Sequence, residues 1–227
     1  PAPMRPYNPS YHRNWKLFWE FTADDLADDG SHQLDLARWL IGKEYPTGVH
    51  SSGGKYPFHD DRDTPVVLAT TYEFDDMLMT FELTQCTQYM QKTPGEIRRG
   101  DEFPHWPQSA TRIEIYGTRQ MMMVSRHGGG WQVFTNNGEV VAQEYGRFPD
   151  RPHKENFLDC IRSRERPNAD VEEGHRSACL IHFASVSYRV GCKKLKFDPM
   201  KERFDDREAN RLLKRKYRKP YEIPTTV

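Results

Sequence analysis

The middle of the chain, residues 46 to 145, constrains the fold most, because its strand-like segments follow one another without helices between them. In "TPVVLATTYEF", Val66, Leu68, Thr70, Tyr72 and Phe74 alternate onto one face of an expected strand. The pair "DD" at 75–76 then turns the chain into "MLMTFELTQC", which predicts a β-hairpin. Parallel strands need long crossovers, so these short connections predict a mainly antiparallel sheet.

Further strands and helices complete this pattern. Residues 111–145 contain "TRIEIYGT", "RQMMMVSR", "WQVFT" and "EVVAQEY", and Asn137-Gly138 is a strong hairpin turn between the last two. We expect the long insertion at 87–109 to be a surface loop. Two helices follow, in "HKENFLDCIRSRER" and "VEEGHRSACLIHFASVSYRVG", and then a short strand, "KLKFD", and a charged helix. The sequence therefore predicts an α+β fold.

Charge and hydropathy exclude some classes of partner. Lys+Arg and Asp+Glu balance at 33 each, which gives no reason to expect a nucleic acid or an anionic membrane as partner. The basic run at 214–219 is interpreted as a solvated helix end. No apolar run is long enough for a transmembrane helix. The start "PAPMRPYNPSYHRNW" has no signal-peptide core and no initial Met, so we expect a chain already in progress. Its location is then cytoplasmic, or periplasmic after removal of an earlier targeting segment.

No complete cofactor or metal motif is present. A phosphate-binding glycine loop needs a helix behind it, but a strand follows "HGGGW" at 127–131, which predicts a hairpin turn. The segment "SSGGKY" at 51–56 also lacks the strand-to-helix context. The four cysteines show no CxxC spacing, and we expect no metal site.

One short segment, "LADDGSHQLDLARWLIG", places Asp28, His32 and Asp35 four and then three residues apart. We expect a helix that is capped by Thr22, Asp24 or Asp25, ends at Gly42 and buries the apolar positions Leu36, Trp39 and Leu40. The three ionisable side chains then share one face. A carboxylate one turn before a histidine can fix the imidazole tautomer for general acid/base catalysis. Spacing alone favours an ordinary polar stripe over a catalytic face.

Aromatic residues near the N-terminus, Tyr11 and Trp15 among them, have two interpretations. Their rings can stack on a sugar or a base, or they can pack within the core and the linker. Packing is the simpler explanation.

Several segments together resemble the C-terminal domain of the Gfo/Idh/MocA oxidoreductases, in particular the bacterial sugar- or inositol-dehydrogenase-like subgroup. The resemblance rests on six stretches that keep their order along the chain. They are "DDGSHQLDLARWLIG", "GG" at 53–54, "DRDTPVVLATTYEF", "IEIYGT", "HKENFLDCIRSRERPNADVEEGHRSA" and "FDP" at 197–199. It implies an open, mainly antiparallel β-sheet with helices packed on one face, and a substrate bound between this domain and a Rossmann domain.

The resemblance also implies roles for individual residues. Asp28 and His32 match the Asp-x-x-x-His pair of the family, in which the His removes the proton of a sugar or cyclitol hydroxyl as hydride leaves the carbon. Asp28 would orient or charge-stabilise His32. Asp35 matches a second acidic position, where substrate binding and a structural role are both open. His153 and Asn156 are expected to line the same cleft, and Tyr11 and Trp15 are candidates for contacting the sugar.

The Rossmann domain is missing from these residues, and with it the glycine fingerprint that binds NAD or NADP. We therefore expect residues 1–22 to form a crossover arm, and residues 23–227 to form a substrate-binding and oligomerisation domain that is inactive without its Rossmann half. The family implies a homodimer or homotetramer formed through the sheet. The alternative is a stand-alone oligomerisation or carbohydrate-binding module without enzymatic activity.

Overall fold

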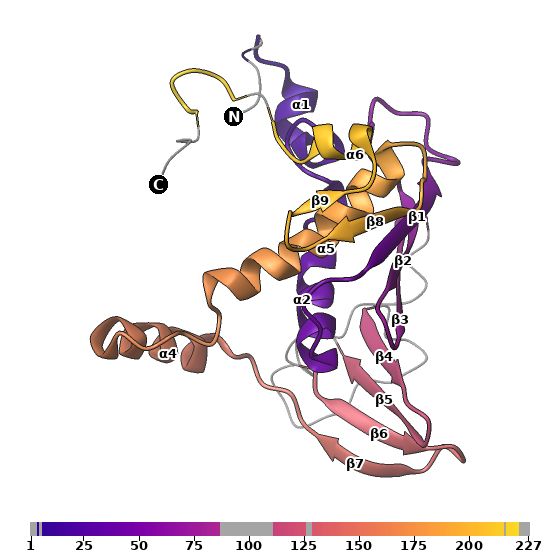
Figure 1. Cartoon of the computed structure of the whole chain (residues 1–227), viewed down its shortest axis with the longest axis vertical. Helices are drawn as coiled ribbons and strands as arrows, with labels where there is room; N and C mark the ends of the chain where they lie inside the picture. The colour runs from indigo at the N-terminus through magenta and orange to yellow at the C-terminus, as the bar shows by residue number, and fades with distance from the viewer. Residues whose placement is uncertain (1–3, 5, 87–110, 126–128, 216, 223–227) are drawn as a thin grey trace. The chain divides into compact units, whose positions relative to one another are not determined.

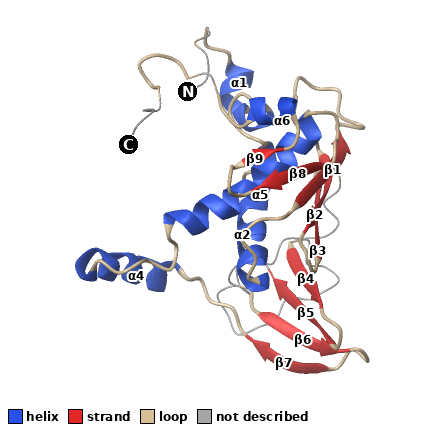
Figure 2. Ribbon diagram, viewed as in Figure 1, coloured by secondary structure: helices blue, strands red, loops and turns tan. Residues whose placement is uncertain are grey.

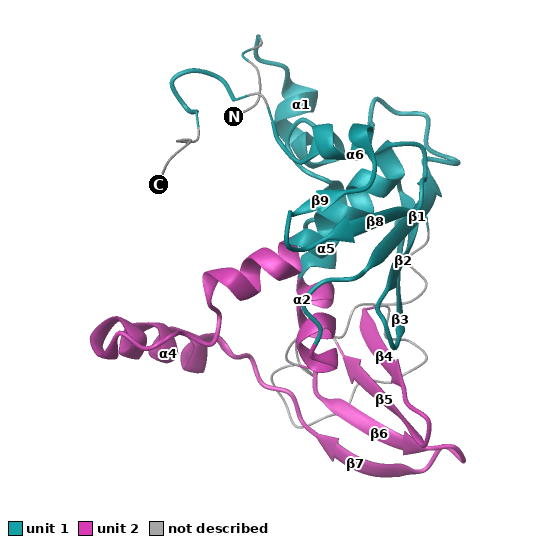
Figure 3. Cartoon of the chain, viewed as in Figure 1, with its two compact units in different colours: residues 1–31, 43–86, 179–227 teal, residues 32–42, 87–178 magenta. Residues whose placement is uncertain are grey.

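The computed structural model describes residues 4, 6–86, 111–125, 129–215 and 217–222. The chain divides into two compact units, shown in teal and magenta in Figure 3. Unit 1 comprises residues 1–31, 43–86 and 179–227, and unit 2 comprises residues 32–42 and 87–178. Each unit contains one antiparallel sheet, which confirms the predicted α+β class.

The sheet of unit 1 has five strands in the order β3-β2-β1-β8-β9, and every neighbouring pair is antiparallel (Figures 1 and 2). The strands are β1 (Gly48–Gly54), β2 (Val67–Glu73), β3 (Leu78–Thr84), β8 (Leu195–Asp198) and β9 (Arg203–Phe204). The predicted 75–76 hairpin is confirmed, because the Phe74 N–H donates to the Met77 carbonyl at 2.9 Å. The predicted alternation is confirmed as well, since Val66, Leu68, Thr70, Tyr72 and Phe74 are all buried.

The buried face of this sheet packs on the second half of α5 (Val171–Arg189). The Tyr72 hydroxyl donates to the Leu180 carbonyl at 2.8 Å, and the Ser51 N–H donates to Ser187 Oγ at 2.8 Å. The side chain of Tyr72 is fully buried, and this burial raises the pKa of its phenol. Helix and sheet are therefore joined by hydrogen bonds between residues far apart in the sequence.

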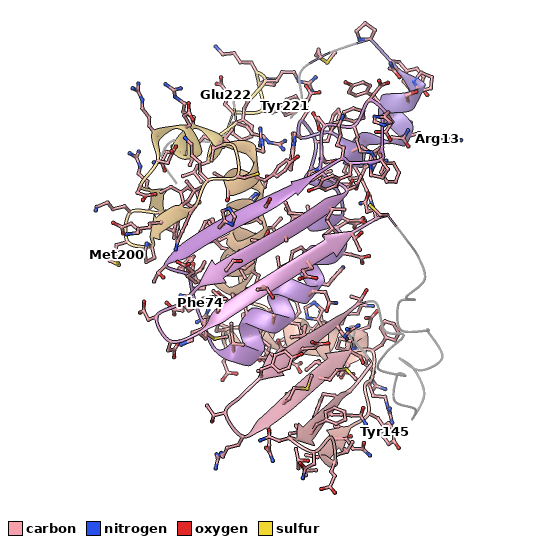
Figure 4. All side chains as sticks on the ribbon, turned by 90° about the vertical axis from the view of Figure 1, so that its right-hand side faces the viewer. Arg13, Phe74, Tyr145, Met200, Tyr221 and Glu222 are labelled. Carbon is pink, nitrogen blue, oxygen red and sulfur yellow. The ribbon has the colours of Figure 1, made fainter. Side chains whose placement is uncertain are left out.

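The opposite face of the sheet is open. Figure 4 views β1, β2 and β3 from this side, with Phe74 labelled beside the β2–β3 hairpin. Ser52, Ala69 and Glu82 form one cross-strand row on this face, and all three are exposed. The alternation of buried and exposed residues is what a sheet with one solvated face requires.

Position 53 of β1 must be a glycine, because no larger residue fits there. A Cβ atom at Gly53 would lie 2.2 Å from the Val67 carbonyl oxygen on the neighbouring strand. Gly53 therefore allows a close approach of β1 and β2, and the pair 53–54 lies at the end of a strand rather than in a strand-to-helix turn.

Unit 2 contains a four-stranded antiparallel sheet in the order β4-β5-β6-β7. Its strands are β4 (Arg112–Tyr116), β5 (Gln120–Ser125), β6 (Trp131–Thr135) and β7 (Val140–Glu144). The predicted turn at Asn137-Gly138 is confirmed, with a φ of 82° at Gly138. The "HGGGW" segment connects the antiparallel pair β5–β6, as a hairpin should, although residues 126–128 are outside the described part. The expected loop at 87–109 also lies outside the described residues.

The helices of unit 2 are α4 (Asp150–Ser163), the first half of α5 and most of α2 (Asp29–Ile41). Both helices expected after the strands are confirmed. In α2 the prediction of the buried face is partly wrong, because Trp39 is 70% exposed and Leu36 and Leu40 are half-buried. The buried positions are instead Gln33, Leu34, Ala37 and Arg38.

The N-terminal segment, expected to form a crossover arm, contains two short helices. They are α1 (Pro9–Arg13) and the 3-10 helix η1 (Trp15–Leu17). Asn8 caps α1 by accepting from the backbone N–H groups of Ser10 and Tyr11, and Pro9 occupies the first helical position. These capping residues explain why α1 begins at Pro9. The domain boundary expected after residue 22 stays a prediction.

The last helix of the described residues is α6 (Arg207–Leu212), which confirms a charged helix near the C-terminus. Asp206 caps it by accepting from the N–H groups of Glu208 and Ala209. Among the helices of the described residues, none has the length and apolar character that crossing a membrane requires.

Candidate functional site

The segment that carries Asp28 is a turn rather than the first part of a helix. Residues Asp24–Leu26 form the 3-10 helix η2, and α2 begins only at Asp29. Asp24 has a φ of +52°, which is incompatible with a continuous right-handed helix. Its carbonyl accepts from the N–H groups of Ala27 at 2.9 Å and Asp28 at 3.0 Å. The helix expected to begin within residues 22–25 was therefore placed too early.

Asp28 lies one residue before α2 and binds Lys16. The Lys16 ammonium donates to Asp28 Oδ2, and both side chains are about half exposed. The hydrogen bond from Lys16 to Asp28 raises the pKa of Lys16, so the lysine stays cationic. No sequence pattern marked Lys16, because twelve residues separate it from its partner.

His32 is the fourth residue of α2, and its side chain is exposed. Solvent access is what a proton-transfer residue needs if a ligand is to reach it. The pairing of Asp28 with His32 stays a prediction.

Asp24 supports the turn from within the core. Its carboxylate is 4% exposed, and Oδ2 accepts from the Thr64 hydroxyl and the Gln85 amide, both at 3.3 Å. Arg62 donates to Gln85 Oε1 at 3.1 Å, which orients the Gln85 amide toward Asp24. Burial raises the pKa of Asp24 above its ordinary value, although the hydrogen bonds from Gln85 and Thr64 act to lower it. In the sequence Asp24 signalled only a helix cap.

Asp35 takes part in a helix-to-helix network of unit 2. Ser177 of α5 donates its hydroxyl to Asp35, and Arg38 donates to Ser177 Oγ at 2.9 Å. The guanidinium of Arg38 also binds the Glu173 carboxylate at 2.7 Å. These contacts favour the structural alternative for Asp35, while its substrate-binding role stays a prediction.

Four further candidates have different surroundings. The Tyr11 ring stacks on Phe18 at 4.1 Å between centroids, whereas Trp15 is 45% exposed. Asn156 in α4 accepts from the Asn168 N–H at 2.9 Å. His153 is exposed on the same helix. Their substrate-binding roles stay predictions.

The described residues do not fit the phosphates of a dinucleotide. Both glycine pairs, at 53–54 and 129–130, lie in or beside antiparallel strands. In the part of the chain that the structure describes, no glycine-rich turn joins a strand to a helix N-terminus. Within that same part, no group of three or more His, Cys, Asp or Glu side chains is arranged to hold a metal ion.

Two antiparallel sheets accompanied by helices agree with the α+β class expected from the sequence. Comparison with family models agrees. Residues 3–123 match the model described as the GFO/IDH/MocA C-terminal domain, and residues 120–223 match the C-terminal alpha/beta domain of the oxidoreductase family. The chain belongs to the Gfo/Idh/MocA oxidoreductase family, as its C-terminal domain. A comparison with curated proteins found no significant match.

Solved structures show the same fold. The WlbA dehydrogenase of Bordetella pertussis, solved with NADH and UDP-GlcNAcA, is 16% identical, with a TM-score of 0.50 over 85% of this chain and 51% of its own. The UDP-N-acetylglucosamine 3-dehydrogenase GnnA of Acidithiobacillus ferrooxidans is 15% identical, with a TM-score of 0.52 over 83% and 52%. A putative NADPH-dependent oxidoreductase of Desulfitobacterium hafniense is 17% identical, with a TM-score of 0.57 over 81% and 51%. The chain thus spans about half the length of these proteins.

Proposed function

We propose that this chain is the substrate-binding and proton-transfer half of an NAD(P)-dependent oxidoreductase that oxidises a hydroxyl group of a sugar or cyclitol. Membership of the family carries the proposal, together with the Asp28–x3–His32 segment at the start of α2. The names of two structurally similar proteins, which refer to nucleotide sugars, support a carbohydrate substrate.

In this proposal the exposed imidazole of His32 accepts the proton of the substrate hydroxyl. Asp28, held by Lys16, orients the imidazole and offsets the positive charge that it gains. Trp15 and Tyr11 offer apolar ring faces for a sugar, and His153 and Asn156 are further candidates for binding its hydroxyls.

The nicotinamide cofactor, bound by the complete enzyme, supplies the hydride acceptor. Because the described residues lack a pyrophosphate cradle, we assign to this chain only the handling of the substrate and its proton. Alone, the chain should bind the cofactor weakly and should not turn over.

The test uses the complete enzyme with NAD+ or NADP+ and a panel of sugars, nucleotide sugars and inositols. With a substrate found in this way, we expect His32→Ala to lower kcat by about 10²-fold or more, because the general base is lost.

A matched control is His182→Gln, which changes an exposed histidine of α5. It should keep the kcat and the pH profile of the parent enzyme. Full activity of His32→Ala on every accepted substrate would refute the assignment of the base.

A second function, oligomerisation or carbohydrate binding without catalysis, is favoured by one observation. The outer face of β1, β2 and β3 is open and carries the small and polar row Ser52, Ala69 and Glu82. This function predicts self-association or sugar binding with no dependence on the cofactor. Turnover by the complete enzyme would exclude it as the whole function.

A further inference from the structure

The backbone at Asp24 differs from other turns of the molecule in being both left-handed and buried. Five non-glycine residues of the described chain have a positive φ. Tyr56, Arg164 and Glu202 are exposed and Cys192 is half-buried, whereas Asp24 is 4% exposed. A left-handed conformation is unfavourable for most side chains, so it needs surroundings that hold it in place.

Thr64 supplies much of that support. Its hydroxyl hydrogen is shared between two acceptors, the Leu17 carbonyl at 3.1 Å and Asp24 Oδ2 at 3.3 Å. Its backbone N–H also donates to the Leu17 carbonyl, at 3.3 Å. Leu17 directly follows Lys16 in η1, and Asp24 holds the N–H of Asp28 through its carbonyl. One buried threonine therefore anchors the two chain segments that carry the Lys16–Asp28 ion pair.

Gln85 provides the second anchor. Its amide donates to the same oxygen of Asp24, and its own carbonyl oxygen accepts from Arg62. Arg62 is in turn held by Asp60, whose two carboxylate oxygens accept from its guanidinium at 2.8 to 2.9 Å. The Gln85 side chain is thus held at both ends, by Arg62 at its carbonyl oxygen and by Asp24 at its amide nitrogen.

We infer that Asp24 is a positioning residue, locked by Thr64 and Gln85 into a left-handed turn that holds Asp28 against Lys16. This inference rests on the proposed function, because it assigns to Asp24 an effect exerted through Asp28. Asp24 itself touches no substrate in this role.

The experiment compares variants in the complete enzyme. Asp24→Gly tolerates the positive φ but removes both accepted hydrogen bonds, and we expect it to lower kcat by about tenfold to a hundredfold with a smaller effect on KM. Asp24→Asn can accept both bonds through its single carbonyl oxygen and should restore most of the loss. Glu202→Gly, a change at an exposed left-handed residue elsewhere in unit 1, is the matched control and should keep the parent kcat.

A double-mutant cycle with Asp28→Asn decides whether Asp24 acts through Asp28. If it does, Asp24→Gly causes no further loss of kcat in the Asp28→Asn background. A full additional loss there, or a parent-like kcat of Asp24→Gly beside an impaired Asp28→Asn, would overturn the inference. Parent-like activity of both Asp28→Asn and His32→Ala would instead overturn the proposed function.

Thr64→Val keeps the test decisive if Asp24→Gly does not fold. Valine has nearly the shape of threonine but cannot donate to Asp24. We expect a loss of kcat in the same direction, which also vanishes in the Asp28→Asn background. A parent-like kcat of Thr64→Val would count against the inference.

Discussion

At the scale of single residues, the structure distinguishes the side chain that stabilises the turn at residues 24–28 from those that face solvent. Asp24 is a buried acceptor, whereas Asp28 and His32 are exposed. Three aspartates at 24, 25 and 28 look equivalent in the sequence, yet their surroundings give them different tasks. The charge of Asp28 is matched by Lys16, while that of Asp24 meets neutral donors in a buried site.

The burial of Asp24 has a consequence for stability. Because its pKa is raised in the folded protein, the ionised carboxylate is less favourable there than in the unfolded chain. The folded state binds more protons in the window from the ordinary pKa of 3.8 up to the raised value, so this group makes the protein less stable as pH rises through that window.

We therefore expect Asp24→Asn to increase the free energy of unfolding at neutral pH, because the amide keeps both hydrogen bonds without the charge. Its advantage should shrink as the pH falls through the raised pKa of Asp24 toward the ordinary value of 3.8, because protonation removes the charge of the parent carboxylate. Urea unfolding at the two pH values measures the difference. An advantage that is the same at both pH values would contradict the role of the charge.

At the scale of elements, α2 and α5 of unit 2 are joined by a network that hydropathy does not reveal. Arg38 is 4% exposed and binds Ser177 and Glu173, which are more than 130 residues away in the sequence. The hydrogen bond from Arg38 lowers the pKa of Glu173. The stabilisation that the Arg38–Glu173 pair provides is therefore lost as the pH falls through that lowered pKa.

Arg38→Met tests this network. Removing the guanidinium leaves Glu173 and Ser177 without their buried donor, and we expect a loss of about 1–3 kcal/mol in the free energy of unfolding. Arg162→Met removes an exposed pair with Asp159 on α4 and should cost no more than about 0.5 kcal/mol. Equal losses in denaturant unfolding would show that burial of Arg38 is unimportant.

At the scale of the whole molecule, the open face of the five-stranded sheet is the surface that the predicted oligomer would use. Ala69 lies on β2, between Ser52 and Glu82 on the neighbouring strands. A self-complementary interface on this face has room for small residues, whereas a long charged side chain would keep the two faces apart.

We expect Ala69→Arg to reduce the mass measured by light scattering from a dimer or tetramer to a monomer. Glu82 directly opposite can pair with the new charge within the chain, so the fold should be preserved, as circular dichroism would report. Lys154→Ala, at an exposed residue of α4 in unit 2 and outside this sheet, is the comparison variant. A parent that is monomeric at high concentration would refute the predicted oligomer itself.

The sequence by itself determined the features that depend on near neighbours in the chain. Alternation from Val66 to Phe74 predicted a half-buried strand, and Asn137-Gly138 predicted a hairpin, because strand periodicity and turn geometry are local properties. The antiparallel α+β class followed from the short connections. A local signal that the sequence analysis did not use is Asn8-Pro9, a cap and a first-turn proline that begin α1.

Only the tertiary structure decided which polar residues meet. Lys16 reaches Asp28, Thr64 and Gln85 reach Asp24, and Ser177 reaches Asp35, although none of these pairs has a recognisable spacing. The start of α2 was also misplaced from the sequence, because the left-handed Asp24 opens the 3-10 turn η2 and α2 begins only at Asp29. Hydrogen bonds between distant segments form only once the chain has brought those segments together, so no pattern of neighbouring residues encodes them.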